Sequence, residues 1–305
     1  MPLKGGPRQY LGVPISGDFL LSLDLSQRWL VENLLTVEGK MMIVGEPKLG
    51  KTLFALQLAM ALTEGVPFLG YNTTKSSVLY TDFESGFYIL GPNIAKMARV
   101  YPQGALNVLY QIRPLGLEEA IRLTREPIPL SPWPTVWFLD TLAHLGIEDE
   151  NSSSKTHQRL DILDRLQNET GTALVLVHHA GKRARGHGDQ QYEGLARARG
   201  SSAIAGWVDT GLDLDRGTAS DRGTFYLGFS TKVGPPQNTI VLDRDAETLT
   251  YSRRNVMSER DEFRVVLADC LREFGELSGG AEPRGPELAQ MMGVRLGMSV
   301  ATVYR

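Results

Sequence analysis

Eight consecutive residues around position 50 constrain the fold more than any other part of the chain. Gly45-Glu46-Pro47-Lys48-Leu49-Gly50-Lys51-Thr52 fits the pattern G-x-x-x-x-G-K-[ST]. The apolar run Met41–Val44 leads directly into it and favours a buried strand, and Lys51–Leu62 follows with apolar residues at helical spacing. A strand, a glycine-rich loop and a helix in this order cradle phosphate groups, because the loop's backbone N–H groups and the helix N-terminus favour an anion.

The positions of this loop have separate chemical roles. The glycines allow the backbone to curl around a β-phosphate, Lys51 would neutralise the β- and γ-phosphates, and the Thr52 hydroxyl would ligate Mg²⁺. ATP and Mg²⁺ are therefore the expected cofactors. The expected nucleotide-binding residues are Gly45, Glu46, Pro47, Lys48, Leu49, Gly50, Lys51, Thr52 and Leu53.

Apolar strands alternate with helical segments through the first two thirds of the chain, which predicts an α/β fold with a mostly parallel sheet covered on both faces. The expected strands are Met41–Val44, Val78–Tyr80, Leu106–Ile112, Val136–Leu139 and Ala173–Val177. The expected helices are Lys51–Leu62, Tyr88–Val100, Leu117–Arg125 and Lys155–Thr170. Four further strands joined by turns predict an antiparallel extension at one edge: Val208–Leu214, Thr224–Ser230, Thr239–Leu242 and Thr248–Tyr251.

Three segments are expected along the chain. Residues 1–35 form a leader whose Phe19-Leu20-Leu21 and Trp29-Leu30-Val31 pack on the core, 36–254 form the ATPase core, and 255–305 form a small helical domain. In the last segment, Gly297–Arg305 is similar to the turn and recognition helix of a helix-turn-helix domain, with Ser299 as the N-cap. The alternative is a small helical cap that packs on the core or on a neighbour.

Composition excludes several classes of protein. The 305 residues carry a formal charge of −3 and one cysteine, Cys270, so a disulfide framework and a cysteine-cluster metal site are excluded. The first ten residues have no apolar segment typical of a signal peptide, and no apolar run approaches the ~18–20 residues that a bilayer requires. We expect a soluble, cytoplasmic protein whose nucleic-acid site, if present, is a local patch or arises on assembly.

Carboxylates and histidines follow the expected strands, where a P-loop protein needs them. Asp140 ends one strand and is the expected Mg²⁺ partner of Thr52. Glu84 could polarise the attacking water as a general base, with Asp82 as its competitor for that role. One of His178 and His179 could sense the γ-phosphate by hydrogen bonding, although a structural histidine is the alternative.

In matching order from about residue 28 to 235, the sequence resembles RecA-like P-loop ATPases of the plasmid RepA hexameric helicase type, relatives of DnaB-type helicases with an AAA_25-type ATPase domain. The stretches that carry the resemblance are Trp29–Glu32, Gly45–Thr52, Val78–Glu84, Leu139–Leu142, Ile147–Asn151, Val177–Ala180, Asp189–Gln191, Arg199–Ile204 and Asp209. The resemblance implies a RecA-like core, ATP hydrolysis between neighbouring subunits and a ring. It also implies that Glu84 is the catalytic carboxylate and His179 the sensor.

One departure from that family concerns the cation that a neighbouring subunit supplies to the transition state. Lys232 matches the Lys of a DnaB-type Lys and Arg pair, but Gly234 stands where the Arg would be. The RepA-type arginine would fall in Tyr226-Leu227-Gly228, which has none. Lys232 alone or Arg222 could serve. Otherwise hydrolysis would be slow or would need a partner's arginine, since such a finger is worth about 10³–10⁵ in rate.

Two parts of the sequence are candidates for contact with DNA. Gly181–Arg199 is rich in glycine and basic residues, and such loops could converge in a ring to attract a single strand; the alternative is a solvated loop at the subunit interface. The helix-turn-helix-like end is the second candidate. The candidate residues are Lys182, Arg183, Arg185, Arg197, Arg199, Thr302 and Arg305.

These observations favour an ATP-hydrolysing DNA motor, a ring helicase, hexameric by resemblance, in replication of a plasmid, phage or mobile element. Lys51, Glu84, His179 and Lys232 are its expected catalytic residues. The alternative is an ATP-switched DNA-binding regulator, or a partition or recombination accessory ATPase without helicase activity. The sequence contains no N-K-x-D base-reading motif, which disfavours a GTPase.

Overall fold

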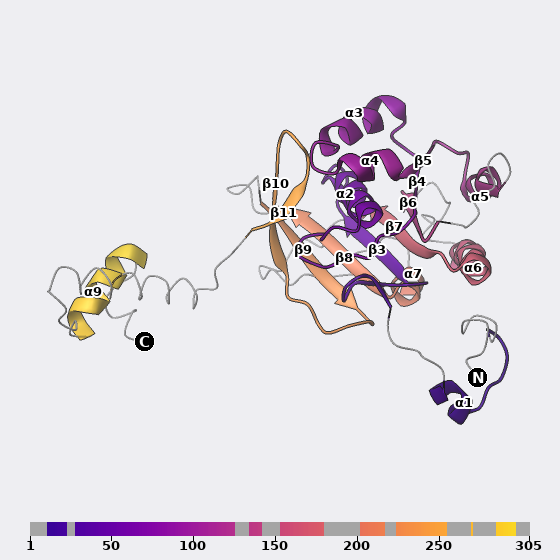
Figure 1. The fold of residues 1–305 in the computed structure, drawn as a ribbon, viewed down its shortest axis with the longest axis horizontal. Helices are drawn as coiled ribbons and strands as arrows, with labels where there is room; N and C mark the ends of the chain where they lie inside the picture. The colour runs from indigo at the N-terminus through magenta and orange to yellow at the C-terminus, as the bar shows by residue number, and fades with distance from the viewer. Residues whose placement is uncertain are drawn as a thin grey trace. The chain divides into compact units, whose positions relative to one another are not determined.

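The structure is a computed structural model that describes residues 11–22, 28–125, 134–141, 153–179, 202–216, 224–254, 270 and 285–296 (Figure 1). The chain divides into two compact units, Met1–Arg254 and Asn255–Arg305. Within the described ranges, no helix combines the length and the apolar character needed to cross a bilayer. All site residues described below belong to the first unit.

The first unit is built on a nine-stranded sheet with the strand order β11-β10-β9-β8-β3-β7-β6-β4-β5. Its parallel strands are β3 (Lys40–Gly45), β4 (Val78–Asp82), β5 (Leu109–Ile112), β6 (Val136–Asp140), β7 (Ala173–His179) and β8 (Thr210–Arg216). The antiparallel extension consists of β9 (Thr224–Thr231), β10 (Ile240–Arg244) and β11 (Tyr251–Arg253). The expected mostly parallel sheet with an antiparallel edge is confirmed.

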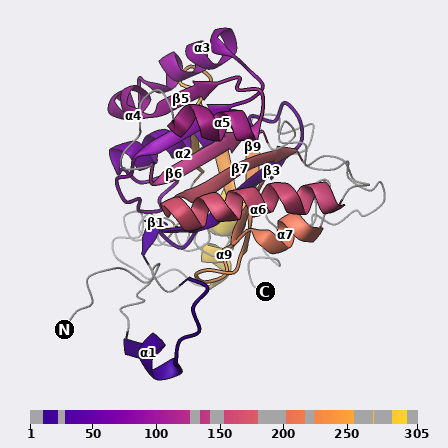
Figure 2. The same ribbon diagram turned by 90° about the vertical axis from the view of Figure 1, so that its right-hand side faces the viewer.

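Helices cover both faces of this sheet, because residues along each central strand alternate between two apolar cores. One core contains Met41 and Ile43 of β3 and receives α2 (Lys51–Glu64), α3 (Phe87–Met97) and α4 (Pro102–Asn107). The other contains Met42 and Val44 and receives α5 (Leu117–Arg125), α6 (Ser153–Thr170) and α7 (Ser202–Trp207). Figure 2 shows α6 and α7 along one side of the sheet.

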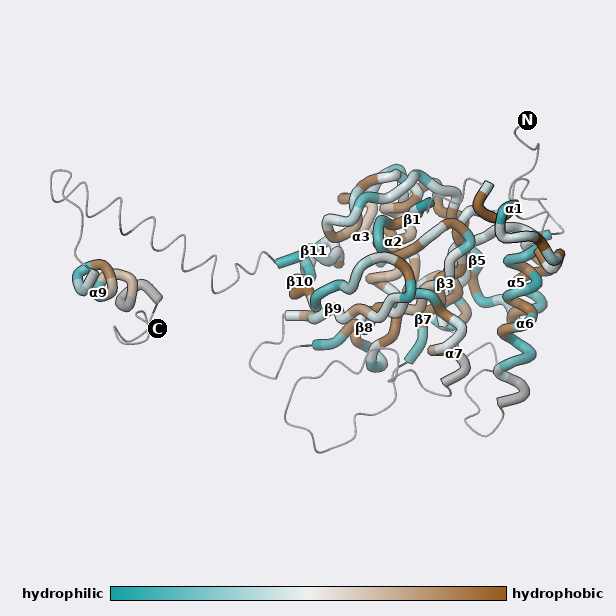
Figure 3. Tube along the Cα trace, turned by 90° about the horizontal axis from the view of Figure 1, so that it is seen from below, coloured by the Kyte–Doolittle hydropathy of each residue, from teal (hydrophilic) through white to brown (hydrophobic). Residues whose placement is uncertain are grey.

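Helices α2 and α6 illustrate how burial follows sequence. Eleven of the fourteen residues of α2 are buried, since the helix lies between the sheet and α4. The tube of α6 alternates between hydrophilic and hydrophobic colours in Figure 3, and its buried side chains include Leu160, Leu163 and Leu166 on one stripe.

A small two-stranded sheet precedes the main one. Its strands are β1 (Trp29–Val31) and β2 (Leu35–Thr36), and Leu30 and Val31 are buried in the first core. Helix α1 (Gly17–Ser22) contains no buried residue, and Leu21 is 85% exposed. Of the two leader segments expected to pack, Trp29–Val31 lies in the core and Phe19–Leu21 does not.

One expected strand begins later than its sequence indicated. Residues from Leu106 were expected to be extended, but Pro102–Asn107 forms α4 and β5 starts at Leu109. Pro102 occupies the first turn of α4, where a missing N–H costs nothing. Gly104 lies so close to α2 that a side-chain carbon there would be 2.6 Å from the Met60 carbonyl oxygen. Tertiary packing on α2 therefore outweighs the apolar pattern.

In the second unit the structure describes residue 270 and α9 (Gly285–Leu296). Ala289 and Met292 are buried on α9. The expected turn and recognition helix at 297–305 lie outside the described residues.

Candidate active site

The glycine-rich loop lies where the central strand β3 ends. β3 ends at Gly45 and α2 begins at Lys51, so the loop is at the carboxyl edge of the parallel strands, where open α/β sheets bind ligands. Lys48 and Gly50 have φ angles of 63° and 105°. Left-handed residues within such a loop turn successive backbone N–H groups toward a common centre, which suits an anion.

Neighbouring strands also restrict the two glycines that bound the motif. A side-chain carbon on Gly45 would lie 2.6 Å from the Leu214 carbonyl oxygen of β8. On Gly50 it would lie 2.3 Å from the Tyr251 hydroxyl and 2.9 Å from an Arg244 nitrogen. The antiparallel extension therefore touches the phosphate-binding loop, which the motif did not indicate.

Lys51 is 4% exposed and its ammonium group is held inside the site. Its Nζ donates a hydrogen bond of 2.9 Å to the Glu46 carbonyl oxygen and lies 3.1 Å from Nδ1 of His179. Burial lowers the pKa of Lys51 to about 8, against the charges of Asp140, Glu84 and Glu46, which raise it. An anionic ligand would favour the charged form of this amine.

Asp140 is buried at the end of β6 and has one carboxylate oxygen available. Its Oδ2 accepts a 2.7 Å hydrogen bond from the Tyr80 hydroxyl, whereas Oδ1 has no hydrogen-bond partner in the described part of the chain. Burial raises the pKa of Asp140 to about 6, and hydrogen bonds from Tyr80 and Thr52 oppose this shift. A buried acceptor without a partner is costly, so Asp140 and the Thr52 hydroxyl beside it fit a cation.

The side chains at this site do not form a preformed metal cage. Among the described residues, no group of three or more His, Cys, Asp or Glu residues could hold a metal ion. Mg²⁺ is commonly bound by one or two protein oxygens, with substrate phosphates and water completing its coordination. The pair of Thr52 and Asp140 suits that mode of binding.

The turn after β4 separates the roles of its two carboxylates. The Asp82 carboxylate accepts hydrogen bonds from the backbone N–H groups of Glu84, Ser85 and Gly86, at 3.1, 2.9 and 2.9 Å. The Glu84 side chain is 53% exposed, and its Oε2 lies 4.0 Å from Nε2 of His179. Asp82 is thus engaged in holding the turn, and the geometry favours Glu84 as the group that meets a ligand.

His179 lies between Lys51 and Glu84, whereas His178 does not face this site. Adjacent residues of a strand point to opposite faces, and His178 is fully buried beside Val44. With Nδ1 of His179 accepting from the Lys51 ammonium, its proton belongs on Nε2, which faces Glu84. The imidazole can therefore donate a hydrogen bond into the space above the loop.

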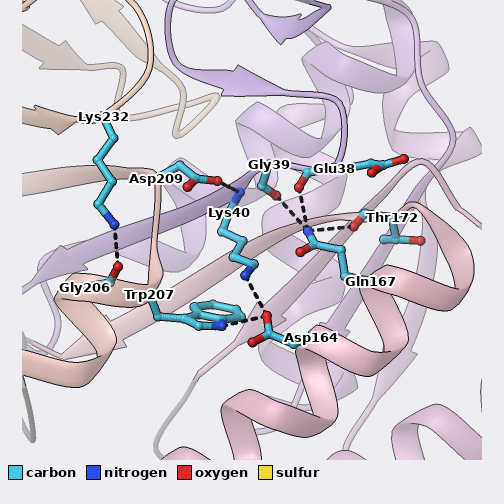
Figure 4. A network of polar contacts seen from close by, with 10 residues as sticks. All are labelled: Glu38, Gly39, Lys40, Asp164, Gln167, Thr172, Gly206, Trp207, Asp209 and Lys232. Carbon is cyan, nitrogen blue, oxygen red and sulfur yellow. Dashed lines mark hydrogen bonds and ion pairs between the residues drawn. The ribbon is translucent and has the colours of Figure 1, made fainter. Parts of the chain in front are cut away.

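Lys232 lies at the opposite edge of the sheet from the loop (Figure 4). It follows Thr231, which pairs with Thr210, and Thr210 pairs with Met41 near the start of β3. Its backbone N–H donates to the Asp209 carbonyl oxygen at 2.8 Å, and its Nζ donates to the Gly206 carbonyl oxygen. Since β3 spans about 16 Å between its ends, Lys232 could serve only the site of another copy.

Packing excludes an arginine at position 234. Gly234 has a φ of 73°, and a side-chain carbon there would lie 3.1 Å from the Asn33 carbonyl oxygen and 3.3 Å from the Trp29 ring. The missing second cation of the DnaB-type pair therefore has a local structural cause.

A polar network fixes α7 beside Lys232 (Figure 4). Nζ of Lys40 bonds Oδ1 of Asp164 at 2.6 Å, and the Trp207 indole N–H donates to the same oxygen at 2.8 Å. The Lys40 ammonium also lies 4.5 Å from the centre of the Trp207 ring. These contacts join the start of β3 to α6 and to the end of α7.

Several candidate residues lie outside the described part of the chain. They are Lys182, Arg183, Arg185, Arg197, Arg199, Arg222, Thr302 and Arg305.

The structure adds residues that the sequence analysis missed. Tyr80 orients Asp140, Tyr251 donates a 3.3 Å hydrogen bond to the Gly50 carbonyl oxygen, and Arg113 donates to the Glu84 carbonyl oxygen. No motif surrounds Arg113, Arg244 or Tyr251. The available signal was that strands adjacent in the sheet bring their ends together.

A match to the AAA domain family AAA_25 covers residues 14–185, which is more than half of the chain. The chain belongs to this family. Its fold is similar to the ATPase domain of a DnaB-like helicase, with a TM-score of 0.51 and 15% identity over 72% of this chain and 85% of that one. It is also similar to a KaiC-like protein from Pyrococcus horikoshii, with a TM-score of 0.52 and 12% identity over 74% of this chain and 93% of that one. The AAA_25 protein is a P-loop ATPase with the RecA-like fold, as its sequence indicated.

Proposed function

We propose that this protein is an ATP-hydrolysing DNA motor, a RepA/DnaB-like ring helicase that acts in the cytoplasm in replication of a plasmid, phage or mobile element. The observation that carries the proposal is the convergence of Lys51, His179 and Glu84 above the phosphate-binding loop. Lys51 contacts His179 at 3.1 Å, and His179 lies 4.0 Å from Glu84. This array combines a phosphate cation, a hydrogen-bond donor and a general base.

The hydrolysis step assigns one role to each of these groups. The loop's N–H groups and Lys51 would bind the β- and γ-phosphates, and Thr52 and Asp140 would hold Mg²⁺, which neutralises charge on those phosphates when bound. Glu84 accepts a proton from water as the water oxygen attacks the γ-phosphorus. The bond from that phosphorus to the bridging oxygen breaks, and ADP leaves with the oxygen. Nε2–H of His179 would donate to a γ-phosphate oxygen.

A ring of subunits, of the hexameric kind that the resemblance implies, would complete the site. Lys232 lies at the edge of the sheet away from its own loop, so it could supply charge to the site of a neighbour. Head-to-tail contacts that place one edge of a subunit against the other edge of the next close into rings. Single-stranded DNA would be contacted by the basic residues of Gly181–Arg199, and the segment 255–305 is proposed as a separate helical DNA-binding domain.

The packing at Gly234 favours a second candidate function. With the Arg position filled by glycine, Lys232 would act without the second cation, and hydrolysis would be slow. A slow ATPase with a helix-turn-helix would suit an ATP-switched DNA-binding regulator or a partition or recombination accessory protein. Such a protein would bind duplex DNA tightly with Lys51→Ala and lose that binding on deletion of residues 285–305.

The test is the rate of ATP hydrolysis by wild type and Glu84→Gln without nucleic acid, with single-stranded DNA and with duplex DNA. For the motor, single-stranded DNA stimulates the wild type strongly. Glu84→Gln lowers kcat by about 10²–10⁴-fold while nucleotide binding persists, because only the base is lost. Glu247→Gln, at a surface carboxylate 84% exposed, is the matched control and should behave as wild type. Normal turnover by Glu84→Gln would refute the catalytic assignment.

A further inference from the structure

The main-chain carbonyl of Glu84 is gripped from a neighbouring strand end. Arg113 follows β5, and its Nε and Nη2 donate hydrogen bonds of 3.2 and 2.9 Å to the Glu84 carbonyl oxygen. Two donors of one guanidinium on a single oxygen fix both the position and the direction of that carbonyl. Arg113 belongs to no motif described above, and the hydrolysis step does not use it.

The rest of the turn is restrained from its other side. The carboxylate of Asp82 accepts from the N–H groups of Glu84, Ser85 and Gly86, and the N–H of Phe83 donates to the Asp140 carbonyl oxygen at 2.7 Å. The donors of the turn are thus held from within, and the carbonyl of Glu84 is held from outside. The Glu84 side chain projects from a backbone that is fixed in both directions.

The backbone of Arg113 is itself built into this arrangement. Its N–H donates to the Asp82 carbonyl oxygen at 2.7 Å, and its φ is 54°, an uncommon conformation for a residue with a side chain. The guanidinium lies over Gly86, where a side-chain carbon would be 3.1 Å from Nε. Residues held in sparsely populated backbone conformations concentrate at functional sites.

We propose that Arg113 is a positioning residue for hydrolysis: by holding the Glu84 carbonyl, it sets the direction in which the Glu84 carboxylate meets the attacking water. This inference rests on the proposed role of Glu84 as general base. Arg113 acts through the backbone of Glu84 and does not touch the reacting atoms. It therefore governs the catalytic step and leaves nucleotide binding, which depends on the loop at Gly45–Thr52, unchanged.

The experiment compares Arg113→Met, Arg113→Lys and wild type under the conditions in which the wild type turns over fastest. Met retains the aliphatic cover over Gly86 but has no donor, whereas Lys retains one donor group. We expect Arg113→Met to lower kcat by about 10–100-fold, because a displaced base of about 1 Å has effects of this size. Nucleotide Kd should stay within about twofold of wild type, and Arg113→Lys should recover part of kcat.

Arg99→Ala is the matched control, because Arg99 is an exposed arginine with only a 3.9 Å ion pair to Glu247. It should leave kcat unchanged. Thermal unfolding of every variant reports folding directly. Should Arg113→Met fail to fold, the kcat and Kd of Arg113→Lys give the answer, and a fall in both together would overturn the proposal in favour of a structural role.

The double variant Glu84→Gln/Arg113→Met distinguishes action through Glu84 from direct action. If Arg113 works only through Glu84, the double variant has the same residual rate as Glu84→Gln. A further fall would overturn the proposal, since Arg113 would then act on the transition state itself. Wild-type kcat in Arg113→Met would also overturn it, while a loss of activity in Glu84→Gln alone would leave the proposed function standing.

Discussion

Single residues of the phosphate-binding loop are selected by their neighbours as well as by the ligand. Gly50 has a left-handed backbone, contacts the Tyr251 hydroxyl through its carbonyl and leaves no space for a side chain beside Arg244. The glycine of the motif is therefore needed before any phosphate is bound. At this scale the loop and the antiparallel extension are one packed feature.

Gly50→Ala should lose about 2–3 kcal/mol of stability, because a positive φ strains alanine and its methyl group meets Tyr251. The measurement is chemical denaturation. Gly70→Ala is a matched control, since Gly70 has a φ of 87° with nothing within 4 Å of the added carbon, and it should lose only the backbone contribution. Tyr251→Phe in the Gly50→Ala background should recover part of the difference. Equal losses at Gly50 and Gly70 would show that the contact with Tyr251 is unimportant.

Among the elements, the edge strand β11 is completed by a side chain of α2. Gln57 donates from Nε2 to the Tyr251 carbonyl oxygen at 2.8 Å and accepts from the Tyr251 N–H at 2.7 Å. Its Nε2 also donates to the Tyr101 hydroxyl at 3.1 Å. The buried amide thus takes the place of a further strand and satisfies an edge that would otherwise have unpaired backbone groups.

Gln57→Leu should destabilise the first unit by about 2–4 kcal/mol, because it leaves the buried N–H and carbonyl of Tyr251 without partners. The free energy of unfolding from urea titration measures this. Gln103→Leu, at an exposed position of α4, is the control and should change stability by less than about 0.5 kcal/mol. A loss of similar size in both variants would contradict the role given to Gln57.

Local patterns predicted most elements and the phosphate-binding loop, because strand, loop and helix are contiguous there. The expected strand at Leu106 was displaced by α4, since the contact of Gly104 with α2 is not visible in a local pattern. Contacts between remote strands were also out of reach. Tyr251 meets Gly50 across 201 positions of sequence, and Arg113 meets Glu84 only because β5 pairs with β4. Such contacts depend on strand order and register, which the sequence does not display.

On the scale of the whole molecule, the loop and Lys232 lie at opposite edges of the same sheet. A single subunit therefore presents an incomplete site on one side and a cation for another site on the other. This arrangement makes hydrolysis a property of assembled subunits in the proposed ring.

Mixing two inactive variants tests this arrangement. Lys51→Ala lacks the phosphate cation and Lys232→Ala lacks the cation supplied to a neighbour, so each alone should be inactive. In an equal mixture, about a quarter of the sites would combine an intact loop with a neighbour's intact Lys232. ATP hydrolysis should recover to that extent. A mixture of Lys51→Ala with Glu84→Gln is the control without recovery, because both changes fall in the same site; no recovery in the first mixture, with mixed assembly shown, would remove Lys232 from the mechanism.

The bond between Tyr251 and Gly50 gives the loop a mechanical link to the end of the first unit. β11 carries Tyr251, and the chain leaves the unit after Arg254, whose Nε donates to the Asp243 carboxylate at 3.0 and 3.1 Å. Gln57 holds the backbone of Tyr251 to α2, the helix that begins at the loop. A displacement of the loop is therefore transmitted as a pull on the last strand, and everything after residue 254 is tethered to a lever whose short arm is the phosphate-binding loop.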